Sequence, residues 1–264
     1  MPLYPASSTP AERRPVRAVV CDLDHTLTSR SSMVELCRAL HAPPAETAML
    51  FRRYQAGELS HSQSRQALLE LLRRSGRAHR TNIEAAFNAM EIKDEAVRLA
   101  TALRERAVPL CLISSSAQLY VDIMTERLSA ADGYGNGQLC FDDTGWLTDL
   151  DFTAETEQLK ADQLHRFTTR HAFHARDVIA IGNGNGNGRN DLLMFDATRR
   201  GILVTTTTSA QHAHRAWATV HSLDEVITTS TLRTPHLRNH DEEHDPRCKC
   251  RECGASSLGS EGGL

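Results

Sequence analysis

The sequence contains no long hydrophobic run and no secretory signal. None of its apolar runs approaches the roughly eighteen residues that a membrane-spanning helix needs. The first fifteen residues include four prolines and no apolar core segment, so we expect a disordered lead there and no cleaved signal peptide. These absences predict a cytoplasmic protein without a membrane partner.

The sequence also lacks an excess of basic residues and a disulfide framework. Its 30 Lys and Arg are balanced by 33 Asp and Glu, and the resulting net charge of −3 argues against a dominant role in binding nucleic acid. The seven cysteines are an odd number, and Cys21 and Cys111 fall in strongly apolar segments, so we expect reduced thiols. A chain of 264 residues is long enough for one sizeable core and a smaller insertion.

The most informative segment is an apolar run that ends in two carboxylates. Residues 16–21 are rich in β-branched side chains, which is typical of a strand buried on both faces of a parallel sheet. Asp22 and Asp24 follow it, and side chains two residues apart on an extended chain point the same way. Ionised Asp22 can then attack phosphorus if a cation screens its approach, and Asp24 can protonate the leaving oxygen. The alternative is that the two acids only cap the next turn.

Two later apolar runs have the same character. Residues 108–113 end at Ser114, and residues 177–181 lead into a loop rich in glycine and asparagine. Because the carboxyl ends of parallel strands meet at one edge of a doubly wound sheet, we expect a ligand site where these strands end. The sequence therefore predicts an α/β fold with three layers, in which a Rossmann-like, doubly wound parallel sheet carries helices on both faces.

The stretch between the first and second of these strands is predicted to be helical. Ser60 and Gln63 have the spacing of a capping box, and apolar residues at helical spacing follow from Ala67 to Leu72. A similar spacing recurs in residues 97–103. We therefore expect several helices to be inserted between the strands.

The segment Asp22-Leu23-Asp24-His25-Thr26 resembles the DxDxT motif of the haloacid dehalogenase-like (HAD) superfamily of phosphohydrolases. Further motifs follow in that family's order, and the resemblance covers roughly residues 16 to 230. It implies that Asp22 is the nucleophile and that Asp24 acts as acid and then as base. The side chains that it implies for phosphate binding are those of Thr26, Ser114, Ser115 and Lys160. Taken alone, Ser114 or its neighbours could equally be a helix cap, and a single Lys could simply be solvated.

The glycine-rich loop departs from that family's GDGxND pattern. Counting back from Asn190-Asp191 places the metal-binding Asp of the pattern at Asn187, and counting from the strand places it at Asn183. The resemblance implies a Mg²⁺ ion held by Asp22, Asp24, Asn187 and Asp191, with Asn183 as the alternative to Asn187. An amide oxygen can ligate Mg²⁺ but brings no charge, and one unit-charge pair about 4 Å apart is worth roughly 4 kcal/mol at a dielectric near 20. Some members of the superfamily, those similar to soluble fragments of P-type ATPases, look like this GNGxND form.

The helical stretch resembles the cap of the phosphoserine-phosphatase-like branch, and a predicted hairpin within residues 137–148 resembles the hairpin that precedes the Lys of the third motif in the same branch. That branch has a substrate-recognising Glu shortly after its first motif, whereas Glu35 lies too late in this chain, so phosphoserine is not predicted as the substrate. The expected divisions are a disordered lead (1–15), a HAD-like core (16–30 and 108–230), a helical cap (31–107) and a disordered tail (231–264).

The tail contains a cluster of metal-binding residue types. His244, Cys248, Cys250 and Cys253 lie within ten residues and could bind Zn²⁺ as a Cys₃His site. Their CxCxxC spacing is less specific than paired CxxC motifs, and the basic residues between the cysteines lower thiol pKa values with or without a metal. A reactive, disordered tail is the alternative.

Two functions of different class follow. The first is a magnesium-dependent phosphatase that hydrolyses a small phosphorylated metabolite through an aspartyl-phosphate intermediate. The second is a catalytically impaired HAD-like domain that binds a phosphorylated ligand or a protein. The sequence does not predict the oligomeric state.

Overall fold

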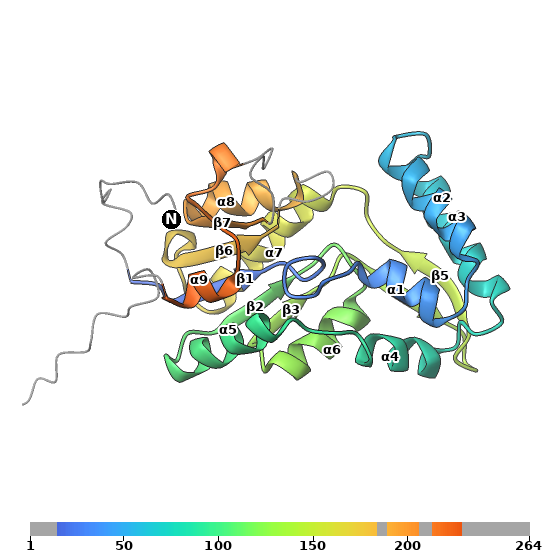
Figure 1. Cartoon of the computed structure of the whole chain (residues 1–264), viewed down its shortest axis with the longest axis horizontal. Coiled ribbons are helices and arrows are strands. Elements are labelled where there is room, and N and C mark those ends of the chain that lie inside the picture. Colours follow the sequence, from blue (N-terminus) through green and yellow to red (C-terminus); the bar gives the residue numbers. More distant parts are fainter. Residues whose placement is uncertain (1–14, 184–188, 206–212, 229–264) are drawn as a thin grey trace, which may run out of the picture. The chain divides into compact units, whose positions relative to one another are not determined.

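A computed structural model describes residues 15–183, 189–205 and 213–228 (Figure 1). The described residues all belong to one compact unit. Three predictions of the sequence lie outside the described residues: the lead, Asn187 in the glycine-rich loop, and the tail with His244, Cys248, Cys250 and Cys253.

A parallel sheet of six strands forms the centre of this unit, in the order β3-β2-β1-β6-β7-β8. The strands are β1 (Ala18–Cys21), β2 (Leu110–Ile113), β3 (Asp132–Tyr134), β6 (Val178–Gly182), β7 (Gly201–Val204) and β8 (Ala218–Val220). All neighbouring strands in this sheet pair in parallel. The predicted doubly wound α/β fold is therefore confirmed, and the predicted strands begin one or two residues later than expected.

The order of strands reverses direction between β1 and β6. From β1 the chain winds outward through β2 to β3, and from β6 it winds the other way through β7 to β8. Such a reversal leaves a crevice at the carboxyl ends of the two central strands, where α/β proteins bind their ligands. Asp22 follows β1 directly and Asn183 follows β6 directly, so both residues lie at this crevice.

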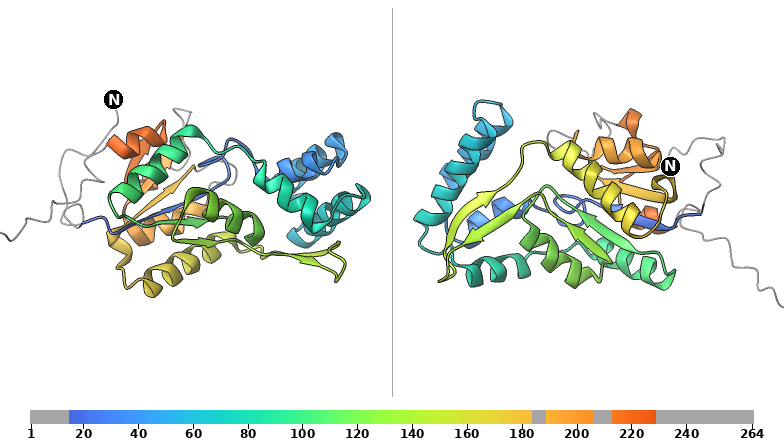
Figure 2. Two further views of the ribbon diagram at one scale, coloured as in Figure 1. Left: turned by 90° about the horizontal axis from the view of Figure 1, so that it is seen from below. Right: turned by 180° about the vertical axis from the view of Figure 1, so that it is seen from behind.

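Helices cover both faces of the sheet (Figure 2). One face packs against α5 (Asp94–Glu105), α6 (Gln118–Leu128) and α9 (Leu223–Thr228), and the other packs against α7 (Thr156–Arg170) and α8 (Leu192–Thr198). The side chains of β1 alternate between the two cores, since Val19 and Cys21 belong to the first and Ala18 and Val20 to the second. This burial on both faces explains why β1 reads as a continuous apolar run. Short 3₁₀ helices span Ala175–Asp177, Arg189–Asp191 and Ala213–Arg215.

Four helices are inserted between β1 and α5: α1 (Ser32–Ala39), α2 (Pro44–Gln55), α3 (His61–Arg74) and α4 (Arg80–Asn88). The predicted capping box begins α3, where the Ser60 side chain accepts from Gln63 N and Gln63 Oε1 accepts from Ser60 N. The predicted hairpin is also present, as β4 (Gln138–Phe141) and β5 (Leu147–Asp151), and β5 contacts α3.

The inserted helices share the core of the α5 face of the sheet, since Leu68, Leu72 and Phe87 belong to the same apolar cluster as Val19. Helix α5 contacts β2 and α9, so it covers the sheet although it lies within the predicted cap range of 31–107. The division into core and cap remains a prediction.

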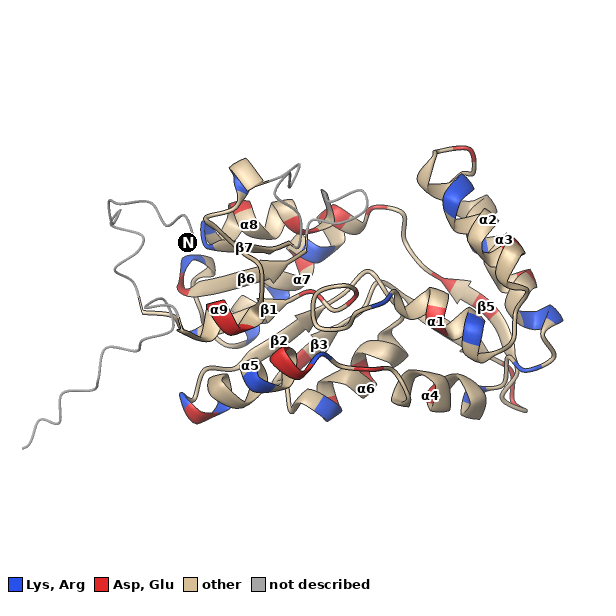
Figure 3. Cartoon of the chain, viewed as in Figure 1, with Lys and Arg blue, Asp and Glu red and all other residues tan. Residues whose placement is uncertain are grey.

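Charged residues of both signs occur on the sheet-bound helices and on the inserted helices (Figure 3). Among the helices of the described ranges, none is both long and apolar enough to cross a membrane.

Candidate active site

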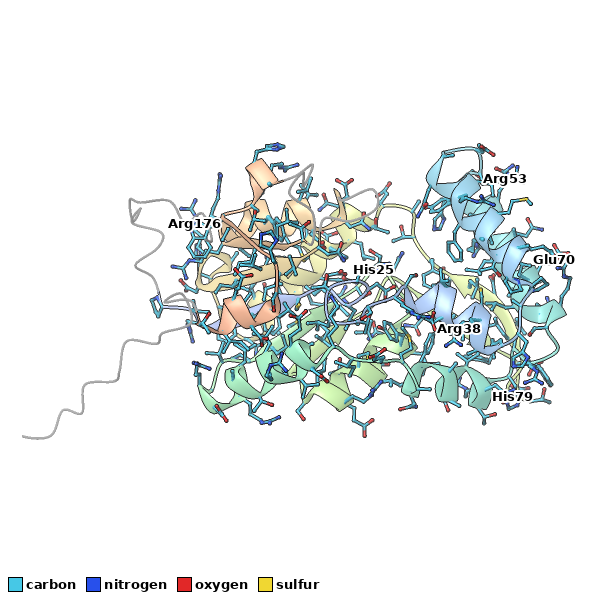
Figure 4. All side chains as sticks on the ribbon, viewed as in Figure 1. His25, Arg38, Arg53, Glu70, His79 and Arg176 are labelled. Atoms are coloured by element: carbon cyan, nitrogen blue, oxygen red, sulfur yellow. The ribbon has the colours of Figure 1, made fainter. Side chains whose placement is uncertain are left out.

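The loop after β1 places Asp22 and Asp24 on the wall of one cavity of about 190 Å³. Asp22 N donates to Ile181 O at 2.9 Å, which fixes the start of the loop against β6. The loop then turns tightly, because the main-chain nitrogens of Thr26, Leu27 and Thr28 all donate to Leu23 O. His25 adopts a positive φ of 62° in this turn and also lines the cavity (Figure 4).

A buried cation lies between two carboxylates at the base of the cavity. Lys160 Nζ, from α7, donates to Asp22 Oδ1 at 2.7 Å and to Asp191 Oδ1 at 2.8 Å. All three side chains are nearly inaccessible to solvent, with exposed fractions of 3%, 9% and 6% respectively. Gly182 allows this approach, since a Cβ there would lie 2.3 Å from Asp191 Oδ2. Asp191 therefore supports the site by holding the Lys160 ammonium group.

Thr26 and Asn183 hold the second oxygen of Asp22. Thr26 Oγ1 donates to Asp22 Oδ2 at 3.0 Å, and Asn183 Nδ2 lies 3.3 Å from the same oxygen. Asn183 Nδ2 also lies 2.6 Å from Asp24 O and 2.9 Å from Thr26 Oγ1. Thr26 is fully buried and is not itself among the described residues that line the cavity. Its hydroxyl therefore fixes the orientation of the Asp22 carboxylate.

The carboxylate of Asp24 is held by the first residue of the inserted helices. Ser32 donates to Asp24 Oδ2 from its main-chain nitrogen at 2.9 Å and from its hydroxyl at 2.7 Å. Ser32 Oγ also lies 2.6 Å from Ser116 Oγ, which belongs to the loop after β2. Asp24 Oδ1 is buried, and the buried hydroxyl of Tyr120 interacts with the Asp24 carboxylate. Ser32 thus fixes one oxygen of the Asp24 carboxylate at the edge of the cavity.

The loop after β2 supplies hydroxyl groups opposite these carboxylates. Ser114 is buried at the end of the strand and lines the cavity together with Ser115 and Asn190. Asn190 Nδ2 donates to Ser115 Oγ at 3.1 Å, and Thr156 Oγ1 donates to Asn190 Oδ1 at 2.9 Å. The structure therefore brings together every predicted site residue that it describes.

Burial and charge shift the pKa values of these groups. Burial raises the pKa of Asp24 to about 6, the two hydrogen bonds from Ser32 oppose this shift, and the charge of Asp22 adds to it. Burial lowers the pKa of Lys160, but the carboxylates of Asp191 and Asp22 outweigh burial and hold that pKa above its usual range. Near neutral pH, Lys160 is therefore charged, and Asp24 titrates close to the pH range in which a general acid and base works well.

The oxygen atoms near Asn183 fit a magnesium ion. Within the described residues, no group of three or more His, Cys, Asp and Glu side chains is arranged to hold a metal ion. However, Asp22 Oδ2 and Asp24 O converge on the side-chain amide of Asn183, which presents its own oxygen to them after a half-turn about the Cβ–Cγ bond. Carboxylate, carbonyl and amide oxygens are the ligands that Mg²⁺ prefers. Asn183, the alternative ligand predicted by counting from the strand, lies beside these two oxygens, and its role as a ligand remains a prediction.

Sequence reasoning did not identify several residues of the site. Ser32 lies eight residues after Asp24 and has no recognisable motif, and Asn190 was noted only as part of the glycine-rich loop. Lys93, which precedes α5, donates to His25 O at 3.1 Å and to Thr26 O at 3.0 Å and so fixes the turn after β1. Glu35 forms ion pairs with Arg30 and Arg38 and does not line the cavity.

Comparison with protein families gives one match. Residues 19–196 match the family described as haloacid dehalogenase-like hydrolase. A search of curated proteins gives no match.

Several solved structures have a similar fold. A phosphoserine phosphatase with a phospho-aspartyl intermediate analogue is 18% identical with a TM-score of 0.64, and the alignment covers 81% of this chain and 98% of that one. A substrate-bound phosphoserine phosphatase is 17% identical with a TM-score of 0.64 and the same coverage. A probable phosphoserine phosphatase from Vibrio cholerae, unliganded, is 18% identical with a TM-score of 0.64, and the alignment covers 84% of this chain and 67% of that one. At these identities the likeness shows the fold.

Proposed function

The chain belongs to the haloacid dehalogenase-like hydrolases, and from this premise we propose that it is a magnesium-dependent phosphatase. Its substrate is a phosphate monoester of a small molecule, and Asp22 forms an aspartyl-phosphate intermediate. The observation that carries this proposal is the contact of Asp22 with Lys160 in a cavity that Asp24 also lines. The similar fold of a phosphoserine phosphatase that holds a phospho-aspartyl intermediate analogue supports it.

In the first step a carboxylate oxygen of Asp22 attacks phosphorus. The new bond joins this oxygen to phosphorus while the bond from phosphorus to the leaving oxygen breaks. Asp24 gives its proton to the leaving oxygen, so the alcohol departs neutral. The raised pKa of Asp24 favours this role, because a carboxyl group with a pKa of about 6 keeps a substantial protonated fraction near neutral pH.

In the second step water attacks the phosphorus atom of the intermediate. Asp24, now ionised, accepts a proton from the water, and the bond between phosphorus and Asp22 breaks to release inorganic phosphate. Lys160 offsets the negative charge of Asp22 and of the phosphoryl oxygens, as a point charge on a fixed helix can do. The hydroxyls of Ser114 and Ser115 donate to phosphoryl oxygens from the opposite wall.

The residues proposed to hold Mg²⁺ are Asp22, through a carboxylate oxygen, Asp24, through its main-chain oxygen, and Asn183, through its amide oxygen. The ion supplies positive charge that permits two anions to approach one another. Replacing a carboxylate by an amide leaves this set with one negative charge fewer, so we expect weak magnesium binding.

One observation favours a second function, that of a binding domain that has lost catalysis. Asn183 Nδ2 already donates to Asp22 Oδ2 and Asp24 O, so the amide nitrogen satisfies the oxygen atoms that a cation would otherwise bind. In that case phosphorylated ligands bind the cavity without being hydrolysed.

Phosphate release separates the two functions. Wild-type protein is incubated with p-nitrophenyl phosphate and a set of phosphorylated metabolites, with Mg²⁺ or with EDTA, beside the variants Asp22→Asn and Arg176→Met. Arg176 lies on the surface away from the cavity and serves as the control. Hydrolysis that requires Mg²⁺, persists in Arg176→Met and disappears in Asp22→Asn supports the phosphatase. Hydrolysis that survives in Asp22→Asn contradicts it, and no hydrolysis by the wild type together with phosphate-ester binding supports the second function.

A further inference from the structure

A second, larger cavity adjoins the catalytic one. It has a volume of about 360 Å³, and Ser115 and Asn190 line both cavities. One wall comes from α1, α2 and α3, and the other comes from β5 and the segment that leads into α7. An alcohol that leaves phosphorus at Asp22 can therefore extend from the catalytic cavity into this larger one.

The lining of the larger cavity is rich in aromatic and apolar side chains. The inserted helices contribute Phe51, Tyr54, His61 and two apolar residues, and Phe152 follows β5 on the opposite wall. The rings of Tyr54 and His61 are edge to face, with centroids 6.5 Å apart and an interplanar angle of 61°. Such rings present both faces and edges, and these stack favourably with another aromatic group.

None of the described residues that line the larger cavity is an Asp or a Glu. Arg65 is the one Lys, Arg, Asp or Glu among its described lining residues, and one nitrogen of its guanidinium group is engaged within the protein. Arg65 Nη1 donates to Leu150 O at 2.8 Å and lies 3.6 Å from Asp149 Oδ1. Burial lowers the pKa of His61, and the charge of Arg65 lowers it further, so His61 is neutral at pH 7. A ligand that carries an ammonium group therefore finds no carboxylate among these residues to pair with.

Several polar groups of the opposite wall are satisfied by one another. Asn136 Nδ2 donates to Thr153 O, and Asn136 Oδ1 accepts from Thr153 N, each at 3.0 Å. Thr156, Asn190 and Ser115 form the chain of hydrogen bonds described above. The remaining polar lining groups, such as Gln55 and Ser64, are uncharged. Shape and apolar contact, more than charge, therefore decide what fits.

We propose that this larger cavity holds the alcohol part of the substrate, and that the substrate is a phosphate monoester of a bulky, uncharged alcohol with an aromatic body. This inference rests on the proposed phosphatase function and specifies its substrate class. A cavity of about 150 Å³ accommodates a benzene ring, so a cavity of about 360 Å³ has room for a body of up to two rings. Its size also falls within the usual range of small-molecule sites.

Alkyl esters with similar leaving groups test the inference. Release of inorganic phosphate with Mg²⁺ is measured for ethyl phosphate, phenethyl phosphate, naphthylethyl phosphate and phosphoserine, using the full chain. We expect kcat/KM to be roughly 20-fold or more higher for the two aromatic esters than for ethyl phosphate or phosphoserine, since filling an apolar pocket gives selectivity of about this size. Equal or higher kcat/KM for phosphoserine or ethyl phosphate overturns the inference.

Variants of residues that line the larger cavity test whether the preference for aromatic esters arises there. Tyr54→Ala and Phe51→Ala are expected to lower kcat/KM roughly 10-fold for phenethyl phosphate and to leave ethyl phosphate unchanged, while Tyr54→Phe restores the wild-type value. Trp146→Ala is the control, because Trp146 and Tyr54 are similarly exposed, at 44% and 37%, and Trp146 does not line the cavity. Gln55→Glu adds a carboxylate to the wall and is expected to raise kcat/KM for phosphoserine. Loss of ethyl phosphate hydrolysis in parallel with phenethyl phosphate in both alanine variants contradicts the inference.

A binding measurement separates this inference from the proposed function. Calorimetric titration of Asp22→Asn with the same esters is expected to give tighter binding of phenethyl phosphate than of ethyl phosphate or phosphoserine. If no ester is hydrolysed by the wild type but this order of affinities holds, the phosphatase function fails and the ligand class stands. If esters are hydrolysed but the order of affinities is reversed or flat, the ligand class fails and the phosphatase function stands.

Discussion

Lys160 Nζ lies 2.7 Å from Asp22 Oδ1, although 138 residues separate the two in the sequence. Both side chains are buried, and Asp191 accepts a second hydrogen bond from the same ammonium group. Removing one partner of a buried ion pair costs far more free energy of folding than removing one partner of an exposed pair. We therefore expect the contact between Lys160 and Asp22 to affect both the stability of the protein and its catalysis.

Lys160→Met is expected to lower the free energy of unfolding by about 3 to 5 kcal/mol and to abolish hydrolysis, because it leaves two buried carboxylates without their cation. The control is Arg38→Met, which breaks an ion pair that is equally short, at 2.7 Å, and whose arginine side chain is 69% exposed. Its expected cost is below about 1 kcal/mol. Denaturant unfolding measures both. Adding Asp22→Asn to Lys160→Met should recover part of the lost stability, and a double variant less stable than the sum of the singles would contradict this account.

Asp24→Asn is expected to stabilise the metal-free protein at neutral pH. The pKa of Asp24 is about 6 in the folded protein, whereas an unfolded Asp titrates near ~3.9. Between these two pKa values the folded state therefore binds more protons than the unfolded state, so the free energy of unfolding falls as the pH rises through this window. Above the window, the free energy of unfolding keeps this lower value. An Asn side chain does not ionise, so the variant avoids the free-energy penalty of a buried negative charge at this position.

We expect the free energy of unfolding of Asp24→Asn at about pH 7.5 to exceed that of the wild type by about 1 to 3 kcal/mol, and the difference to vanish below about pH 4. Urea unfolding in EDTA across this pH range measures it. A difference that does not change with pH would show that Asp24 is not the titrating group.

Asn183→Asp is expected to strengthen magnesium binding. The substitution restores a negative charge beside Asp22 and the main-chain oxygen of Asp24, so the Mg²⁺ concentration that gives half-maximal hydrolysis should fall by roughly 10-fold to 1,000-fold. In EDTA the same variant should be less stable than the wild type, because Asp22 then faces a like charge and loses a donor. Asn88→Asp adds the same charge at an exposed position and serves as the control. An unchanged magnesium requirement would exclude Asn183 as a ligand.

Ser32→Ala is expected to weaken catalysis through Asp24. The hydroxyl of Ser32 holds Asp24 Oδ2 and opposes the rise of its pKa, so its loss should move the alkaline limb of the kcat/KM profile to higher pH and lower the maximum about tenfold. Ser32→Thr keeps the donor and should restore the profile. Ser29→Ala, on the exposed part of the same loop, is the control. A lower maximum without any shift of the profile would indicate that Ser32 acts on folding or closure and not on Asp24.

The fold could be predicted from the sequence because each element has its own local pattern. Ala18–Cys21 is buried on both faces and therefore consists wholly of apolar residues, which distinguishes it from helices with one polar face. The capping box at Ser60 is satisfied within four residues of chain, so its sequence alone predicted the start of α3. The order of the motifs likewise predicted that Asp22, Ser114, Lys160 and Asp191 belong to one site.

Several contacts of the candidate site could not be predicted, because they join residues that are far apart in the sequence. The contact of Asn183 with Asp22 spans 161 residues, and the contact of Ser32 with Ser116 spans 84, so neither follows from any local spacing. The role of Thr26 in phosphate binding stays a prediction, and only the folded structure shows that its hydroxyl donates to Asp22 Oδ2.

The sequence by itself thus determined the parallel sheet, the inserted helices and the chemical groups available for phosphoryl transfer, since periodicity and residue type are properties of neighbouring residues. The tertiary structure alone decided which Asn faces Asp22, which residue holds Asp24, and that aromatic side chains of α2 and α3 line a cavity beside Ser115. The physical reason is that burial and hydrogen bonding at the site are set by where the carboxyl ends of β1, β2 and β6 meet, and this meeting exists only once the chain has folded.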